Sequence, residues 1–221
     1  MRRTVICCGL ALALTGCQSM RTPPRVGPPA PRVADDEAEE RYAQTLARWT
    51  RRAEVYDRFD SLAFFAVTFL SMEFRVEKVA RLALFQAMPE AEAQAMLELE
   101  RVQHEASHEF LLGVHANERR FDDFASRDSI WRVAIVTERG EALPASLVRL
   151  RKADPEMRAL YPYLESFWTA YLVKFPRAFP DGTPVLPESG KFTLRFSSTL
   201  GKADLVFDLD APGAGGERAR P

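Results

Sequence analysis

The spacing of the apolar residues changes about halfway along the chain, and this change limits the possible fold more than any other feature. Over most of residues 35 to 106, apolar positions recur every three or four residues, as on one face of an α-helix. Beyond that point they alternate with polar residues, for example in KFTLRFSS (191–198) and ADLVFDL (203–209), as in half-buried strands. Helices followed by strands are typical of an α+β fold.

The first half predicts three helices and one strand. Residues 35–60 contain no Gly or Pro and carry one apolar stripe, formed by Tyr42, Leu46, Trp49, Ala53 and Tyr56. This stripe favours packing on the chain's own core over pairing with a partner helix, since it covers few turns. SLAFFAVTFL (61–70) is apolar on both faces, which predicts a buried strand. Ser71 as N-cap and Pro89 as a second start predict a helical hairpin over 72–106.

The second half, residues 108–210, is predicted to be mainly β. Strands are expected at 129–136, 145–150, 165–176, 191–198 and 203–209, the last two joined by a turn at Gly201, with a short helix that starts at Asp154 and Pro155. The sequence therefore predicts an antiparallel, Ig-like β-sandwich of six to seven strands, with the helical hairpin inserted after the first strand. The aromatic residues at strand spacing are expected in the core, and not on a ligand platform: Trp131, Phe167, Trp168, Tyr171 and Phe192.

The first sixteen residues have the order of an export signal. Arg2 and Arg3 precede an apolar run from Val5 to Leu14, which is too short to span a bilayer, and small residues follow it. LTGC at 14–17 resembles the lipobox of bacterial lipoprotein precursors. The resemblance implies cleavage before Cys17, lipidation of Cys17, and stable attachment to a membrane through several acyl chains. Gln18 in place of aspartate favours the outer membrane.

The segments on either side of the predicted domain differ from it in composition. RTPPRVGPPAPR (21–32) has five prolines in twelve residues, so residues 17–34 are expected to form a semi-rigid tether of roughly 50 Å. Residues 211–221 are expected to be a disordered tail. Without residues 1–16 the chain has 30 − 2 = 28 basic and 31 acidic side chains, a balance that disfavours nucleic-acid binding. The three cysteines leave none for a disulfide, because Cys7 and Cys8 lie in the signal.

The strongest candidate for chemistry is QHEASHEF (103–110), which contains HExxH. In zinc peptidases the two histidines of this motif lie one helical turn apart and bind zinc, and the glutamate acts as general base. His104 and His108 would be the ligands here, and Glu105 the base. Glu109 departs from the motif's usual uncharged residue, and no third ligand follows at a familiar spacing. Residues 107–116 also fit either a strand or a continued helix, and only the helix would place both histidines on one face.

Other constellations are weaker. The sequence has no glycine-rich phosphate loop and no nucleophile elbow. Asp122 and Asp123 are adjacent, which favours a solvated turn over a calcium site. The chain as a whole resembles uncharacterised lipoproteins of Gram-negative bacteria, notably myxobacteria. This resemblance implies a location in the cell envelope, and with it we expect a non-catalytic binding or structural role without a cofactor; a zinc-dependent hydrolase is the alternative.

Overall fold

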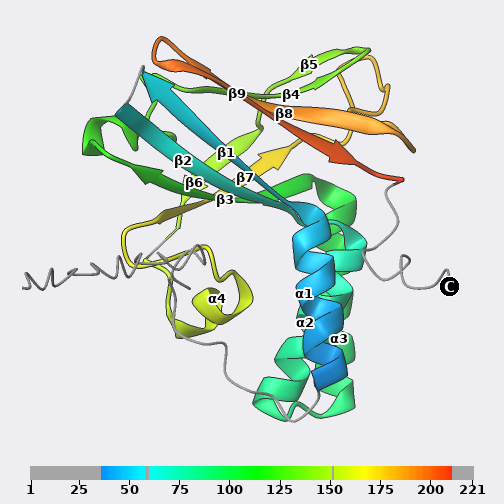
Figure 1. Ribbon diagram of the computed structural model, residues 1–221. Coiled ribbons are helices and arrows are strands. Elements are labelled where there is room, and N and C mark those ends of the chain that lie inside the picture. The colour runs from blue at the N-terminus through cyan, green and yellow to red at the C-terminus, as the bar shows by residue number, and fades with distance from the viewer. Residues whose placement is uncertain (1–35, 58–59, 151, 211–221) are drawn as a thin grey trace, which may run out of the picture.

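The computed structural model describes residues 36–57, 60–150 and 152–210. The predicted signal, Cys17, the tether and the tail lie outside these ranges. Within them the protein has α+β structure, with two antiparallel sheets above a group of helices (Figure 1). None of the helices in the described ranges is both long enough and apolar enough to cross a membrane.

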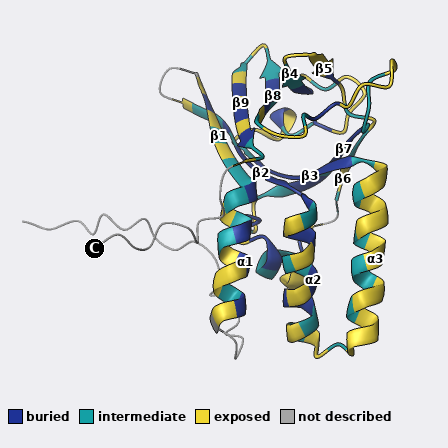
Figure 2. Ribbon diagram, turned by 90° about the vertical axis from the view of Figure 1, so that its right-hand side faces the viewer, coloured by how far each residue is buried: buried dark blue, intermediate teal, exposed yellow. Residues whose placement is uncertain are grey.

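Three longer helices lie side by side beneath the sheets (Figures 1 and 2). They are α1 (Asp36–Trp49), α2 (Met72–Gln86) and α3 (Glu90–Ala106), and α4 (Pro155–Leu160) is a shorter helix. Ser71 caps α2 by accepting a hydrogen bond from the amide of Phe74 at 3.2 Å. Asp154 caps α4 in the same way through the amide of Met157 at 2.7 Å. Both caps agree with the prediction from sequence, because capping depends only on neighbouring residues.

The first sheet has five strands in the order β1-β2-β3-β7-β6, and the second has four in the order β5-β4-β8-β9. Every pair of neighbours is antiparallel. The strands are β1 (Thr50–Asp57), β2 (Asp60–Phe69), β3 (His108–Ala116), β4 (Arg132–Thr137), β5 (Gly140–Ala142), β6 (Ser146–Arg149), β7 (Thr169–Phe175), β8 (Lys191–Ser198) and β9 (Gly201–Asp208). A 3-10 turn, η1 (Arg119–Phe121), follows β3.

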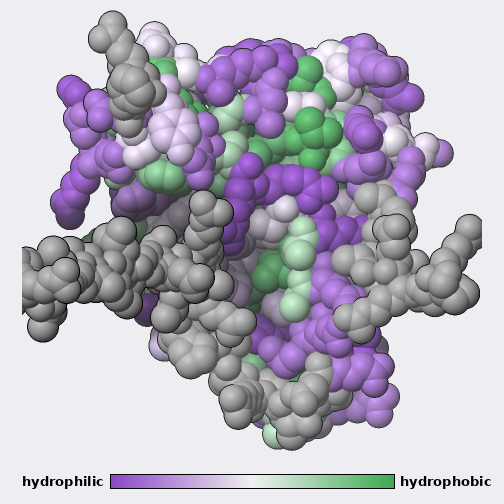
Figure 3. Space-filling view, viewed as in Figure 1, coloured by the Kyte–Doolittle hydropathy of each residue, from purple (hydrophilic) through white to green (hydrophobic). Residues whose placement is uncertain are grey.

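Aromatic rings from the two sheets meet in one core. Phe65 of β2 stacks on Phe196 of β8 with ring centroids 4.9 Å apart, and Phe110 of β3 meets Phe192 of β8 edge to face at 6.1 Å. These four rings are at most 2% exposed. In Figure 2 the buried residues accordingly concentrate in the strands, while α3 presents mainly exposed and intermediate ones. On the face drawn in Figure 3, hydrophobic residues appear in separate areas bordered by hydrophilic ones.

The prediction of one helix over residues 35–60 is wrong beyond Trp49. The chain turns there into β1, which pairs with β2 along its whole length. Ala53 and Tyr56 continued the helical stripe, but Val55, which is 3% exposed, points to the core with the period of a strand. Pairing with β2 outweighs the local helical pattern, because unpaired backbone groups along β2 would be costly. The helical hairpin consequently follows the second strand and not the first.

Several other expectations are corrected. Residues 108–116, which the sequence left open, form strand β3. The two sheets contain two strands that the sequence count of six to seven did not include, β1 and β5. Phe167 is 84% exposed, so its expected place in the core is wrong. It precedes β7, which begins at Thr169, four residues later than predicted, so the strand period does not apply to it.

Candidate functional site

Two cavities lie at opposite ends of β3. The first has a volume of about 580 Å³ and is bounded by the end of β3, the end of β6 and the start of β7. The second has a volume of about 730 Å³ and is bounded by the start of β3, the start of α2 and the segment after β7. We call them the cationic pocket and the histidine cavity. Their lining residues on β3, His108 and Val114, are six positions apart, which is about 20 Å at 3.3 Å per residue, so they are distinct sites.

The HExxH motif lies across a boundary between helix and strand, beside the histidine cavity. Helix α3 ends at Ala106, Ser107 is extended with φ −157° and ψ 158°, and His108 opens β3. His104 and His108 therefore do not lie one turn apart on a helix, as the zinc peptidase motif requires. Both nevertheless line the histidine cavity, because the reversal at Ser107 brings the start of the strand back beside the end of the helix.

The two histidines are held neutral by their surroundings. Burial lowers the pKa of His108 to about 3, with further lowering by the charges of Arg177 and His104. Burial also lowers the pKa of His104, and Arg177 adds to the effect. Nη1 of Arg177 lies 3.2 Å from Nδ1 of His108. A guanidinium at this distance occupies one ring nitrogen and repels a cation near the other, which is unfavourable for zinc.

A third zinc ligand is also missing around this pair. The described residues contain no group of three His, Cys, Asp or Glu side chains placed to hold a metal ion. The third histidine of the chain, His115, lines the cationic pocket at the other end of β3 and therefore cannot reach His104 or His108. Glu105, the proposed general base, is exposed on the last turn of α3. The motif thus has two histidines in one cavity without the geometry that its sequence spacing suggests.

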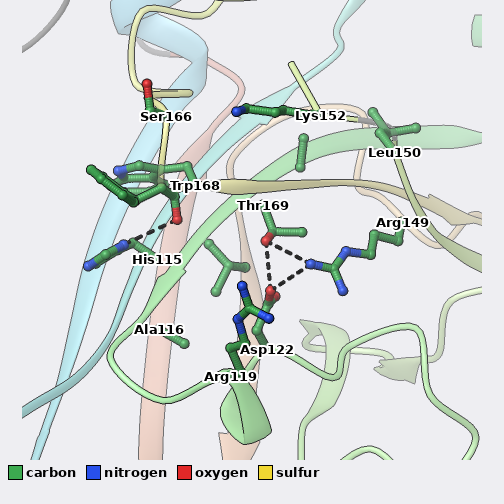
Figure 4. A pocket seen from close by; sticks show the side chains of 13 residues that line it. His115, Ala116, Arg119, Asp122, Arg149, Leu150, Lys152, Ser166, Trp168 and Thr169 are labelled. Atoms are coloured by element: carbon green, nitrogen blue, oxygen red, sulfur yellow. Dashed lines mark hydrogen bonds and ion pairs between the residues drawn. The ribbon is translucent and has the colours of Figure 1, made fainter.

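The cationic pocket gathers side chains from three separate stretches of the chain. The segment that includes the end of β3 and η1 provides His115, Arg119 and Asp122, the end of β6 and the residues after it provide Arg149 and Lys152, and the approach to β7 provides Trp168. Figure 4 shows Asp122, Arg149 and Thr169 joined on one side of the pocket, with Arg119 next to them. His115 and Trp168 lie across the pocket from this group.

Asp122 is the single carboxylate of the pocket, and its oxygens already accept several hydrogen bonds. Oδ2 accepts from Oγ1 of Thr169 at 2.6 Å and from Nη2 of Arg149 at 3.1 Å. Oδ1 accepts from the hydroxyl of Tyr171 at 2.7 Å. Burial raises the pKa of Tyr171, and the bond to Asp122 raises it further, so the phenol remains a donor. Asp122 therefore organises the pocket wall and has little capacity left for a ligand.

Asp123 makes different contacts from its neighbour. Its carboxylate accepts hydrogen bonds from Oγ of Ser129 at 3.0 Å and from the amide of Ile130 at 3.1 Å, which close the loop before β4. The two adjacent aspartates thus point to different partners, as the sequence predicts for neighbours in a turn. Asp122 departs from that expectation in one respect, because its side chain is only 14% exposed and is not a freely solvated group.

Aromatic rings form the other wall of the cationic pocket. The ring of His115 lies between those of Phe64 and Trp168, with centroid distances of 5.9 and 6.1 Å, and Nδ1 of His115 lies 3.3 Å from the carbonyl oxygen of Phe167. The side chain of Phe167 also lines the pocket and is largely exposed. No local pattern in the sequence reveals this site, since its lining residues are up to 56 positions apart; the basic residues within 149–152 are the only local signal.

Comparisons with known proteins add little to this description. No protein-family model matches the chain, and no curated protein matches it. A solved structure from Burkholderia pseudomallei, described as a novel protein of unknown function, is similar with a TM-score of 0.37 and 10% sequence identity, covering 77% of this chain and 83% of that one. This degree of similarity supports no functional argument.

Proposed function

We propose that this protein is a lipoprotein of the bacterial cell envelope, anchored at Cys17 and most consistent with the outer membrane, whose folded domain acts by binding and not by catalysis. The LTGC sequence and the proline-rich stretch after it support the anchor and the tether. The cationic pocket supports the binding role, and it favours a small molecule that carries a carboxylate or phosphate on a ring.

The single observation that carries the binding role is the uncompensated positive charge in this pocket. Arg119, Arg149 and Lys152 face one carboxylate, so the formal balance is +3 − 1 = +2. Asp122 is already bonded to Arg149, Thr169 and Tyr171. Among the described residues, neither Arg119 nor Lys152 forms an ion pair with an acidic side chain. Cations left unpaired around a concave site attract an anion from solution.

The aromatic wall supports a ring as the second part of the ligand. Phe167 exposes 84% of its surface, which costs hydrophobic free energy unless a partner covers it. Trp168 lies beside it on the wall that faces Arg119 and Arg149. A sugar or aromatic ring stacked on these side chains would place an attached anionic group toward the guanidinium groups, which explains why both kinds of residue line one cavity.

We also propose an Ig-like sandwich as the architecture that presents this pocket. If β2 to β9 are lettered A, B, C, C′, D, E, F and G in chain order, the two sheets have the orders A-B-E-D and C′-C-F-G, which are those of immunoglobulin domains. β1 is then an additional edge strand, and the helical hairpin is an insertion between A and B. Trp131, which precedes strand C, is buried against Phe65. In such domains the loops at the sheet ends bind ligands, and the cationic pocket lies at one of these ends.

The binding role is tested on the soluble chain from Gln18. Calorimetry with a hexose phosphate, benzoate and inorganic phosphate should detect saturable binding. The same titrations followed by fluorescence should quench or shift the emission of Trp168. The double variant Arg119→Ala/Lys152→Ala should weaken binding by about tenfold or more, since each charge-assisted hydrogen bond contributes roughly 1.5–3 kcal/mol. The matched control Arg101→Ala/Lys202→Ala removes the same charges elsewhere and should bind normally. Equal weakening in both double variants would contradict a specific site, as would no binding in the panel.

The anchor is tested separately in cells. The wild-type chain should incorporate labelled fatty acid and fractionate with membranes, and Cys17→Ala should lose both properties. A Cys17→Ala chain that is still lipid-modified would refute the lipoprotein assignment.

A zinc-dependent hydrolase remains the second candidate, and the shared cavity of His104 and His108 is the observation in its favour. That function requires near-stoichiometric zinc in the purified chain after supplementation, and the loss of this zinc in His104→Ala. A chain without zinc under these conditions rules it out.

A further inference from the structure

The histidine cavity contains an arginine that forms no ion pair with any carboxylate of the described residues. Arg177 lies two residues beyond the end of β7 and is half-buried at the cavity wall. In the described part of the chain, no carboxylate lies within ion-pair distance of it. Its side chain contacts a neutral ring, with Nη1 of Arg177 3.2 Å from Nδ1 of His108. Burial and the charge of Arg75 lower the pKa of Arg177, and the charge of Glu105, which forms no ion pair with it, offsets only part of this effect.

One N–H group of the Arg177 guanidinium also lacks a hydrogen-bond partner. Its Nε atom is buried and has no hydrogen-bond partner within the described ranges. Buried N–H groups are almost always hydrogen-bonded in folded proteins, so an unpartnered one requires an explanation. The side of a guanidinium formed by Nε and Nη2 matches the two oxygens of a carboxylate. The contact with His108 uses Nη1 and leaves Nε without a hydrogen bond.

A second unpartnered donor lines the same cavity. Nε of Arg48 is also buried without a partner among the described residues. The charge of Arg48 is balanced by Glu73, 2.8 Å from Nη1, so this arginine offers a donor without excess charge. His108 is engaged by both Nη1 and the backbone of Arg177, so it adds no free donor. The cavity thus has two unpartnered arginine N–H groups and one guanidinium without an ion pair.

The rest of the lining is mainly apolar. Trp49, Phe69, Met72, Leu186 and Leu209 contribute to it, while its acidic residues are Glu73, which pairs with Arg48, and the exposed Glu188. One uncompensated charge fits a monoanion better than a doubly charged phosphate, which the nearby Glu73 and Glu188 would repel. The volume of about 730 Å³ leaves room for an apolar body behind the charged group.

We propose that the histidine cavity is a binding site for a small carboxylic acid with an apolar body, whose carboxylate pairs with the guanidinium group of Arg177 at the cavity wall. The site is separate from the cationic pocket and does not depend on its ligand. It gives His104 and His108 a role as neutral wall residues beside the carboxylate, in place of the zinc ligation that their spacing suggests.

The test uses the full chain in a non-ionic detergent and octanoate as the probe. Calorimetry should detect saturable binding of octanoate and at least tenfold weaker binding of octanamide, which has the same body without the charge. In the ¹⁵N-labelled chain, the Nε–H signal of Arg177 should shift on titration. No saturable binding, or equal affinity for octanamide, would overturn the proposal.

Variants locate the site. Arg177→Gln retains a donor for His108 but lacks the charged fork, and should weaken octanoate binding by tenfold or more. Arg177→Lys should bind more weakly than the wild type and more tightly than Arg177→Gln. Arg101→Gln, an exposed arginine on α3, and Arg119→Ala/Lys152→Ala in the cationic pocket should bind octanoate as the wild type does.

Two results would count against the proposal even if a variant fails to fold. The Arg177 Nε–H signal of the wild type reports directly on the site, and its failure to shift during saturable binding would place octanoate elsewhere. If zinc binds at His104 and His108, and octanoate does not weaken this binding, the result would favour a metal site over a carboxylate site. Because Arg119→Ala/Lys152→Ala affects only the cationic pocket, failure of this proposal is distinguishable from failure of the proposed function.

Discussion

Glu109 offers the sharpest test of how this fold is held together, because it is a buried charge at the junction of helices and sheet. Its Oε2 lies 2.8 Å from Nη2 of Arg75 in α2, and its Oε1 lies 2.5 Å from Nζ of Lys174 in β7. Arg75 also pairs with Glu100 of α3 and donates from Nε to the carbonyl of Leu70 at 2.9 Å. The side chains of Arg75 and Glu109 are only 1% and 3% exposed.

We predict that Glu109→Gln destabilises the protein by about 3 kcal/mol. Burial alone would raise the pKa of Glu109, but the hydrogen bonds and charges of Lys174 and Arg75 outweigh it and lower the pKa, so the group is ionised at neutral pH. Removing one partner of a buried ion pair costs roughly 3–5 kcal/mol, because the remaining charge is uncompensated. The lower end applies here, since Glu100 still pairs with Arg75 and Lys174 is 36% exposed and can reach water.

Urea unfolding at pH 7 measures this change as a shift of the midpoint at constant slope. Glu105→Gln is the matched control: it makes the same substitution at an exposed position four residues earlier and should change stability by less than about 0.5 kcal/mol. The double variant Arg75→Met/Glu109→Leu removes both charges and should be more stable than Glu109→Gln, since apolar groups of similar size replace a buried pair at little cost. Equal effects of Glu109→Gln and Glu105→Gln would refute the reasoning.

Three further predictions concern packing, pH and capping. Gly113→Ala should lower the free energy of unfolding by about 1–3 kcal/mol, because its new Cβ would lie 2.9 Å from Cδ2 of Leu164 and 3.0 Å from Cε2 of Tyr163. An unchanged free energy of unfolding would mean that these two side chains can move away. His108 has a pKa of about 3 in the folded chain and about 6.5 in the unfolded chain, so the unfolded chain takes up the proton first as the pH falls. The free energy of unfolding should therefore drop by up to about 2 kcal/mol between pH 7 and pH 5. The same drop in His108→Gln would exclude His108 as the cause. Asp154→Ala should cost about 1 kcal/mol through loss of the cap on Met157, with Asp154→Asn as the control that retains it.

Features that depend on nearby residues could be predicted from the sequence. The caps at Ser71 and Asp154 join residues three positions apart, and the apolar periods of α2, α3, β8 and β9 lie within each segment. These interactions are local, so the residues that make them are visible as short patterns. The same is true of the lipobox at Cys17, which remains a prediction from sequence.

The strand assignment of residues 50–57 and the composition of both cavities depend on distant contacts. β1 exists because β2 offers a complete edge for pairing, and no pattern within residues 50–57 shows this. The approach of Arg177 to His108 follows from the pairing of β3 with β7, which are about sixty residues apart.

The sequence by itself determined the helical and strand periods, the caps and the candidate histidines. Only the tertiary structure decided that His104 and His108 meet across a break between helix and strand, and that Arg119, Arg149 and Lys152 share a pocket with Trp168. The physical reason is that hydrogen bonding within a segment is set by its neighbours, whereas a cavity forms only where separate segments pack together.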